Sequence, residues 1–187
     1  MNTKTKIKNT LDTAFLKSIS KFVSVTLGLA LLAVGLPVPN ANAATAIFTA
    51  DQNFILAAAQ GGMTEVKLGE LASTNGMQAD VKEFGQMMVK DHTVINDDLK
   101  ALAAQKGVSL PASLEAKHQA MVDKMAAMRG TEFDDAYIMG MIKAHQKDAK
   151  AFKAEAAITQ DPDIKSFLDK SIPVVEAHLQ HVTAMKK

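Results

Sequence analysis

Apolar residues recur at alternating steps of three and four along most of the chain after residue 50, the spacing of a helix with one buried face. The first run covers residues 52–75, with Asp51 as its predicted N-cap and Gly76 as its end. One face carries Phe54, Ala58, Gly61, Glu65, Leu68 and Ala72. The pair Gly61-Gly62 disfavours a helix by about 1 kcal/mol per glycine, so we expect a neighbouring element to approach closely there.

The second run, residues 78–106, is the most regular of the chain. Its apolar face carries Val81, Phe84, Met88, His92, Ile95, Leu99 and Leu102. Gly107 predicts its end, and Leu110-Pro111 predicts an extended connection. A shorter helix is then predicted over residues 112–128.

The third long run begins after Thr131, a predicted cap, and places Asp134, Ile138, Met141, His145, Ala149 and Phe152 on one face. Asp161-Pro162 opens the last run as an N-cap followed by proline in the first turn. Its face carries Ile164, Leu168, Ser171, Val175, His178, Val182 and Met185. Pro173 lies inside this run and predicts a kink.

These runs predict the fold class. No alternating strand pattern of useful length is present, so we expect an all-α protein. Four long helices with one shorter helix between the second and third favour a ferritin-like four-helix bundle whose fifth helix lies in the crossover. About 17 residues of helix rise ~25 Å, enough to restart the third long helix from the opposite end. A simple up-and-down bundle with an extra capping helix is the alternative.

Near its middle, each long helix carries one possible metal ligand on its apolar face: Glu65, His92, His145 and His178. All four lie ~21 to 26 Å along their helices, at a common depth. Three imidazoles and a carboxylate suit one transition-metal ion, which could be Fe, Zn, Mn or Cu. Asp148, three residues after His145, could orient a ring or join the ligands. The alternative is a polar layer whose members hydrogen-bond one another without a metal.

A second candidate site lies on the shorter helix, where His118, Met121, Met125 and Met128 share a face. Thioethers with an imidazole favour Cu(I), although methionine at helical spacing is also ordinary core filling. His181 is expected to be exposed. The sequence predicts no catalytic residue and no organic cofactor, and our interpretation leans away from an enzyme.

The first 43 residues predict a different kind of segment. Five lysines and one aspartate flank or precede an apolar run over residues 22–36, followed by Ala41-Asn42-Ala43, the pattern of a cleaved signal peptide. This leaves one domain over residues 44–187 and predicts a periplasmic protein. Removing five of 21 basic and one of 20 acidic residues changes the net charge from +1 to −3. We therefore expect no nucleic-acid partner and no integral membrane association after cleavage, while a homo-oligomer remains open.

Four stretches carry a resemblance to a known family: FILAAAQGGMTEVKLGEL at residues 54–71, VKEFGQMMVKDH at 81–92, GTEFDDAYIMGMIKAH at 130–145 and PVVEAH at 173–178. The chain resembles a family of secreted bacterial proteins known as a domain of unknown function. Its members are often labelled predicted outer membrane proteins and are placed in the ferritin-like superfamily. The outer-membrane label has no physical support in this sequence, which shows no barrel strands and contains no cysteine to lipidate.

The resemblance implies a ferritin-like bundle with Glu65, His92, His145 and His178 as inward positions, linked to envelope or oxidative stress. Ferritin-like di-metal proteins use Glu-x-x-His motifs on two helices. Here Val89 and Val175 stand three residues before His92 and His178. Ferroxidase chemistry is therefore not expected. We expect instead either a mononuclear site or a scaffold without metal. The remaining alternative is a non-enzymatic structural or interaction module with core histidines.

Overall fold

A computed structural model describes residues 49–186 of the 187-residue chain. This range contains five helices and no strand, which confirms the all-α class. The helices are α1 (Thr49–Asn75), α2 (Ala79–Gln105), α3 (Ala116–Ala126), α4 (Gly130–Ile158) and α5 (Pro162–Met185). The predicted signal peptide lies outside the described residues. Within them, no helix combines the length and apolar character needed to cross a membrane.

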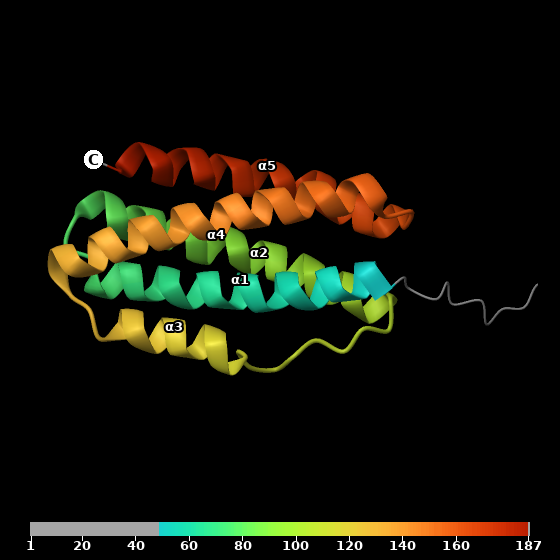
Figure 1. Cartoon of the computed structure of the whole chain (residues 1–187), viewed down its shortest axis with the longest axis horizontal. Helices are drawn as coiled ribbons and strands as arrows, with labels where there is room; N and C mark the ends of the chain where they lie inside the picture. Colours follow the sequence, from blue (N-terminus) through green and yellow to red (C-terminus); the bar gives the residue numbers. More distant parts are fainter. Residues whose placement is uncertain (1–48, 187) are drawn as a thin grey trace, which may run out of the picture. The chain divides into compact units, whose positions relative to one another are not determined.

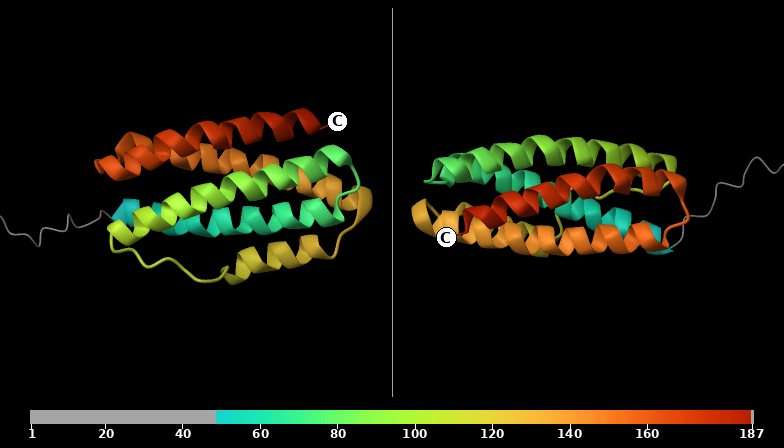
Figure 2. Two further views of the ribbon diagram at one scale, coloured as in Figure 1. Left: turned by 180° about the vertical axis from the view of Figure 1, so that it is seen from behind. Right: turned by 90° about the horizontal axis from the view of Figure 1, so that it is seen from above.

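The four long helices lie side by side and surround one interior (Figure 1). α1 packs along α2 and α4 along α5, while α1 also contacts α4 and α2 contacts α5. Figure 2 shows this arrangement from two further directions. α2 and α4 run in the same direction because the connection between them, including α3, returns along the outside of α1. An up-and-down order would make these two helices antiparallel.

Several predicted helix ends agree with the structure for the expected reasons. The Asp161 side chain accepts hydrogen bonds from the backbone N–H groups of Asp163 and Ile164, and so caps α5. Gly107 has a φ of 68°, and the N–H of Val108 donates to the Ala103 carbonyl across it. This is the left-handed glycine turn that ends many helices. α5 continues as one helix through Pro173.

The shorter helix differs from its prediction. α3 begins at Ala116 rather than at residue 112, because the preceding segment is held by a buried side chain of α1. The Gln60 amide donates to the Ser113 carbonyl at 3.0 Å and accepts from the Glu115 N–H at 2.8 Å. Backbone groups satisfied in this way have no need of helical partners.

α1 and α4 also begin elsewhere than predicted. α1 starts at Thr49, so Asp51 is not a cap but a buried side chain in the first turn, beside Glu155. In the first half of α1 the buried residues include Ile55 and Ala59 rather than the predicted Phe54 and Ala58, which are half-buried. α1 contacts α2, α3 and α4, so a single predicted stripe underestimates its buried surface.

The N-cap of α4 is Arg129 rather than Thr131. Asp134, predicted for the apolar face, has a specific structural role there. Its fully buried carboxylate accepts hydrogen bonds from the backbone N–H groups of Met77 and Gln78, both at 2.9 Å. It thereby fixes the turn between α1 and α2, and its burial is compensated by two charge-assisted bonds.

The close approach predicted at Gly61-Gly62 occurs at Gly62 but not at Gly61, and Gly69 and Gly85 provide a further one. A Cβ atom on Gly85 would stand 2.6 Å from the Ala72 side chain and 2.8 Å from the Gly69 carbonyl. A Cβ on Gly62 would meet the Asn96 side chain, whereas one on Gly61 would have nothing within 4 Å. Gly69 and Gly85 therefore allow α1 and α2 to touch, and Gly61 faces open space.

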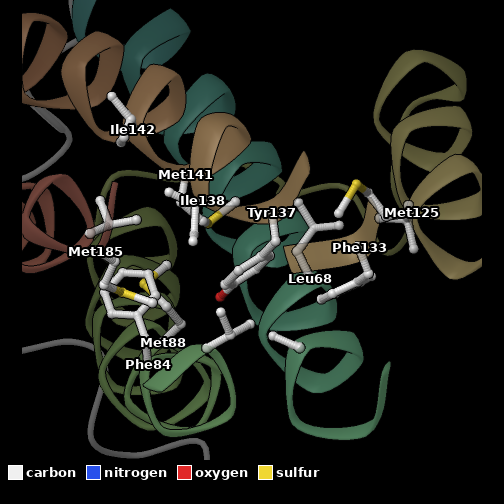
Figure 3. Packing of buried hydrophobic residues seen from close by; sticks show 14 residues of the cluster. Leu68, Phe84, Met88, Met125, Phe133, Tyr137, Ile138, Met141, Ile142 and Met185 are labelled. Carbon is white, nitrogen blue, oxygen red and sulfur yellow. The ribbon is translucent and has the colours of Figure 1, made fainter. Parts of the chain in front are cut away.

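Two hydrophobic clusters fill the interior at its two ends. The tyrosine cluster includes Phe84, Phe133, Tyr137 and Met141, and Figure 3 shows Tyr137 among its apolar neighbours. The other cluster, which includes Leu99, Phe152 and Leu168, occupies the opposite end. Between the two clusters, each long helix buries at least one polar residue, and four of these residues lie close to one another in the interior: Glu65, His92, His145 and His178. We call these four residues the histidine layer.

Candidate metal centre

Three helices each place one histidine in the histidine layer: His92 from α2, His145 from α4 and His178 from α5. Each ring offers one nitrogen, and these atoms all lie within 4.8 Å of one another. The ring centroids are 5.3 to 5.6 Å apart. The three exposed fractions are 3%, 0% and 2%, so the helical stripes bring the predicted histidines together in a closed interior.

One nitrogen of each ring faces an acceptor. His92 Nδ1 lies 3.1 Å from Glu65 Oε2, and His145 Nδ1 lies 3.0 Å from the carbonyl of Met141. A carbonyl only accepts, so His145 Nδ1 carries the hydrogen. An ionised Glu65 would fix the same tautomer on His92.

The third ring, His178, also has one nitrogen facing an acceptor, but this nitrogen is Nε2 rather than Nδ1. His178 Nε2 lies 3.0 Å from Oδ2 of Asp91, whose side chain is 32% exposed. A carboxylate there makes His178 Nε2 the donor. The hydrogen bond of a ligating histidine to a carboxylate or carbonyl is the usual means of setting which nitrogen faces a metal.

The remaining nitrogen of each ring, His92 Nε2, His145 Nε2 and His178 Nδ1, is buried without a hydrogen-bond partner. With the opposite nitrogen donating, which for His92 requires an ionised Glu65 and for His178 an ionised Asp91, each of these atoms presents a lone pair. Three uncompensated lone pairs in a dry interior are unfavourable unless something positive or hydrogen-donating meets them. The donor set therefore fits a transition-metal ion.

Burial also keeps His92 and His145 in the neutral form that binds metals. Desolvation lowers the pKa of His92 well below its usual value, and the neighbouring His145 and His178 lower it further. Desolvation, then repulsion from His178, lowers the pKa of His145 to about 4. Both rings are thus available as ligands at neutral pH without losing a proton.

Glu65 lies where the sequence predicted, with an exposed fraction of 5%. Its two oxygens are 3.1 Å from His92 Nδ1 and 3.5 Å from His145 Nδ1. Burial raises the pKa of Glu65 well above the usual value, and the nearby Asp148 carboxyl raises it further. The structure thus brings Asp148 against Glu65, and within residues 49–186 no hydrogen bond or ion pair joins Asp148 to the three rings.

The face predicted on the shorter helix borders a cavity of about 320 Å³ between α1, α3 and α4. His118, Met121 and Met125 line it together with Met141 of α4, and we call it the methionine cavity. Met128 instead packs against the tyrosine cluster.

The cavity wall is only partly buried. His118 Nδ1 pairs with Thr64 Oγ1 at 3.0 Å, and burial followed by the Lys117 charge lowers its pKa. Met121 is 51% exposed, while Met125 is buried. His181 is exposed as predicted and lies over Phe84.

Two residues of this region were missed by sequence reasoning. Asp91 precedes His92 and therefore falls off the apolar stripe, so periodicity alone gave it no role. Its carboxylate beside a predicted ligand was the available signal. Tyr137 is the second: its hydroxyl is buried without a hydrogen-bond partner, and the residue lines the methionine cavity.

Residues 36–185 match a family described as a domain of unknown function, DUF4142. The chain belongs to this family. It matches none of the curated proteins.

Solved structures show a similar fold. CopM in its Cu(I)-bound form is 18% identical with a TM-score of 0.61, covering 74% of this chain and 96% of that one. Its Cu(II)-bound form is 20% identical with a TM-score of 0.62, covering 72% of this chain and 94% of that one. A DUF305 fragment from Deinococcus radiodurans is 10% identical with a TM-score of 0.65, covering 74% and 95%.

Proposed function

For this member of the DUF4142 family, we propose that the bundle binds one transition-metal ion through His92, His145 and His178 and serves in metal handling. The observation that carries the proposal is the arrangement of the six ring nitrogens. Three are turned toward acceptors and the other three are buried without a hydrogen-bond partner. One nitrogen from each ring also lies within 4.8 Å of the others.

A metal-free polar layer accounts less well for this geometry. The three rings do not hydrogen-bond one another, because each has one nitrogen engaged elsewhere and one without a partner. A water molecule placed among them has two hydrogens and would leave one lone pair unsatisfied. A cation accepts all three lone pairs at once.

The surrounding carboxylates support the same function. Glu65 and Asp91 are placed to orient rings, through His92 Nδ1 and His178 Nε2. Glu65 becomes a fourth ligand only if its carboxylate turns away from His92 Nδ1. Three imidazoles, with or without one carboxylate, suit Zn²⁺, Fe²⁺, Mn²⁺ or Cu²⁺. Val89 and Val175 replace the glutamates of a ferritin-like di-metal site. We therefore propose sequestration or transfer of the ion rather than oxidative turnover.

The cellular setting is part of the proposal. The parallel α2 and α4, joined through α3, support a ferritin-like bundle with its short helix in the crossover. The signal-like residues 1–43 and the net charge of −3 that would remain support a periplasmic protein. A role in envelope or oxidative stress rests on superfamily analogy.

Metal analysis of the protein lacking residues 1–43 tests the proposal. Samples refolded with Zn²⁺, Fe²⁺, Mn²⁺ or Cu²⁺ and then desalted should retain one equivalent of at least one metal. His92→Ala, His145→Ala and His178→Ala should each lose at least nine-tenths of it. His181→Ala, which removes an exposed histidine from the same helix as His178, is the matched control and should retain it. Less than a tenth of an equivalent of every metal in the unsubstituted protein would favour the structural-module alternative.

Copper(I) handling at the methionine cavity is the second candidate function. It is favoured by the three thioethers and one imidazole that line a single cavity, and by the copper-bound CopM structures of similar fold. Met121→Leu/Met125→Leu should then weaken Cu(I) binding at least tenfold. Met77→Leu, at an exposed methionine outside the cavity, should not. Equal Cu(I) affinity in both proteins would reject this second function.

A further inference from the structure

The histidine layer is closed, so an ion that binds there must pass through the protein. The methionine cavity reaches inward as far as Glu65 and Asp148. A second, smaller cavity of about 20 Å³ is lined by Glu65, Asp148 and His92 itself. That volume holds about one water-sized particle.

The two cavities share three lining residues: Gly61, Glu65 and Asp148. We call these three residues the neck: Gly61 and Glu65 lie one turn apart on α1, and Asp148 lies on α4 against Glu65. Beyond the neck, His92 lines the smaller cavity. The two cavities therefore adjoin each other between the face of α3 and the histidine layer.

The space around the glycines of α1, α2 and α4 agrees with this arrangement of the cavities. Within α1 and α2, a Cβ on Gly62, Gly69 or Gly85 would stand closer than 3.0 Å to another atom. A Cβ on Gly61 or on Gly140 of α4 would have nothing within 4 Å, and both residues line the methionine cavity. Gly61 and Gly140 are thus not required for helix packing. Each disfavours its helix by about 1 kcal/mol relative to alanine, although alanine would fit.

We propose that the methionine cavity is the route by which a metal ion enters and leaves the histidine layer, and that Gly61 and Gly140 keep this route open. This inference rests on the proposed metal site. Glu65 and Asp148 supply oxygen ligands at the neck, where an ion has left bulk water and has not yet reached the three imidazoles. The other candidate route lies along α2 and α5, where the partly exposed Asp91 contacts His178.

The proposal predicts a kinetic effect without an equilibrium one. A side chain that fills the neck raises the barrier for passage in both directions, so the association and dissociation rates fall by the same factor and the affinity is unchanged. Damage to the site itself would instead speed dissociation and lower the occupancy. The two cases are therefore distinguishable in one protein.

The test uses Co²⁺, whose visible absorption reports coordination, in stopped-flow mixing with the protein lacking residues 1–43. Gly61→Leu should bind one equivalent at least tenfold more slowly than the unsubstituted protein, and a chelator should remove it at least tenfold more slowly. Gly61→Ala and Gly140→Leu should show smaller decreases in the same direction. Ala151→Leu, at an exposed position of α4 outside both cavities, should leave both rates unchanged.

Circular dichroism and thermal melting accompany each variant. Gly61→Ala is expected to melt at or above the temperature of the unsubstituted protein, so a slower rate there cannot come from unfolding. Unchanged rates in Gly61→Ala, Gly140→Leu and any folded Gly61→Leu, at full occupancy, would overturn the route. No Co²⁺ bound by the unsubstituted protein would reject the metal site and, with it, the route.

Discussion

The histidine layer and the methionine cavity are both built from polar or polarisable residues on helical stripes, yet they offer different chemistry. The histidine layer is enclosed by four helices, and each ring has one nitrogen engaged and one unpartnered. The methionine cavity lies beneath α3, and Met121 at its edge is half exposed. Enclosure makes the imidazole lone pairs dependent on a ligand, whereas an open wall leaves its groups in contact with water.

The largest difference should appear when metal is removed. An ion held at the histidine layer stabilises the folded state by about 4 kcal/mol when its free concentration is a thousand times Kd. Chelation of the loaded protein should therefore lower the melting temperature by several degrees, and His145→Ala should abolish that shift. His118→Ala, in the methionine cavity, should preserve it. Equal shifts in both variants would place the ion elsewhere.

Acid should affect the two histidine environments differently in the metal-free protein. The pKa of His145 is about 4 in the fold and 6.5 when unfolded, so the unfolded chain binds more protons between these values. Stability should thus decrease by roughly 3 kcal/mol as pH falls from 7 to 4.

His92 adds to this loss, whereas the raised pKa of Glu65 opposes it. The third ring, His178, faces both His92 and His145. The contribution of His145 is therefore obtained as the difference between the unsubstituted protein and His145→Gln in urea unfolding at each pH. His118→Gln, at the partly exposed ring, should give a much smaller difference. A pH-independent difference for His145→Gln would argue against a neutral buried ring.

The packed contact between α1 and α2 and the cavity side of α1 should respond oppositely to an added methyl group. Gly85→Ala places a Cβ against Ala72 and the Gly69 carbonyl, and should destabilise by about 1 to 3 kcal/mol. Gly61→Ala, which faces the methionine cavity, should be neutral or stabilise by up to about 1 kcal/mol. Urea unfolding of both variants measures the contrast, and equal destabilisation would mean that the cavity side is also packed.

The carboxylates that orient the rings should have an intermediate effect. Asp91→Asn weakens the hydrogen bond that fixes His178, and should reduce metal affinity about 10- to 100-fold. Competition with a chromophoric chelator measures this change. Asp98→Asn, at an exposed position of the same helix, is the matched control and should leave the affinity unchanged.

The smallest effect should separate two methionines of one helix. Met125 is 8% exposed and Met121 51%. Met125→Leu should change stability by less than about 1.5 kcal/mol, and Met121→Leu by less than about 0.5 kcal/mol. A larger loss for Met121→Leu in metal-free protein would show that α3 lies more deeply than this structure indicates.

Hydrophobic periodicity correctly predicted the buried residues wherever a helix buries a single stripe. All seven predicted face residues of α5 are buried, and in α2 only Ile95 is half-buried instead. The same regularity placed His92, His145 and His178 inside at one depth. It was less accurate for α1 and α3, because α1 contacts three other helices and Gln60 holds the segment before α3 in a non-helical conformation.

The sequence by itself determined the helices, the inward face of each long one and the identity of the residues in the histidine layer, since these depend on local spacing. Only the tertiary structure decided which ring nitrogen is left free, because that depends on acceptors from other turns and other helices: Glu65, the Met141 carbonyl and Asp91. It also decided that Gly85 is packed while Gly61 faces a cavity. Two glycines with similar local sequence requirements differ only in what the neighbouring helices place beside them.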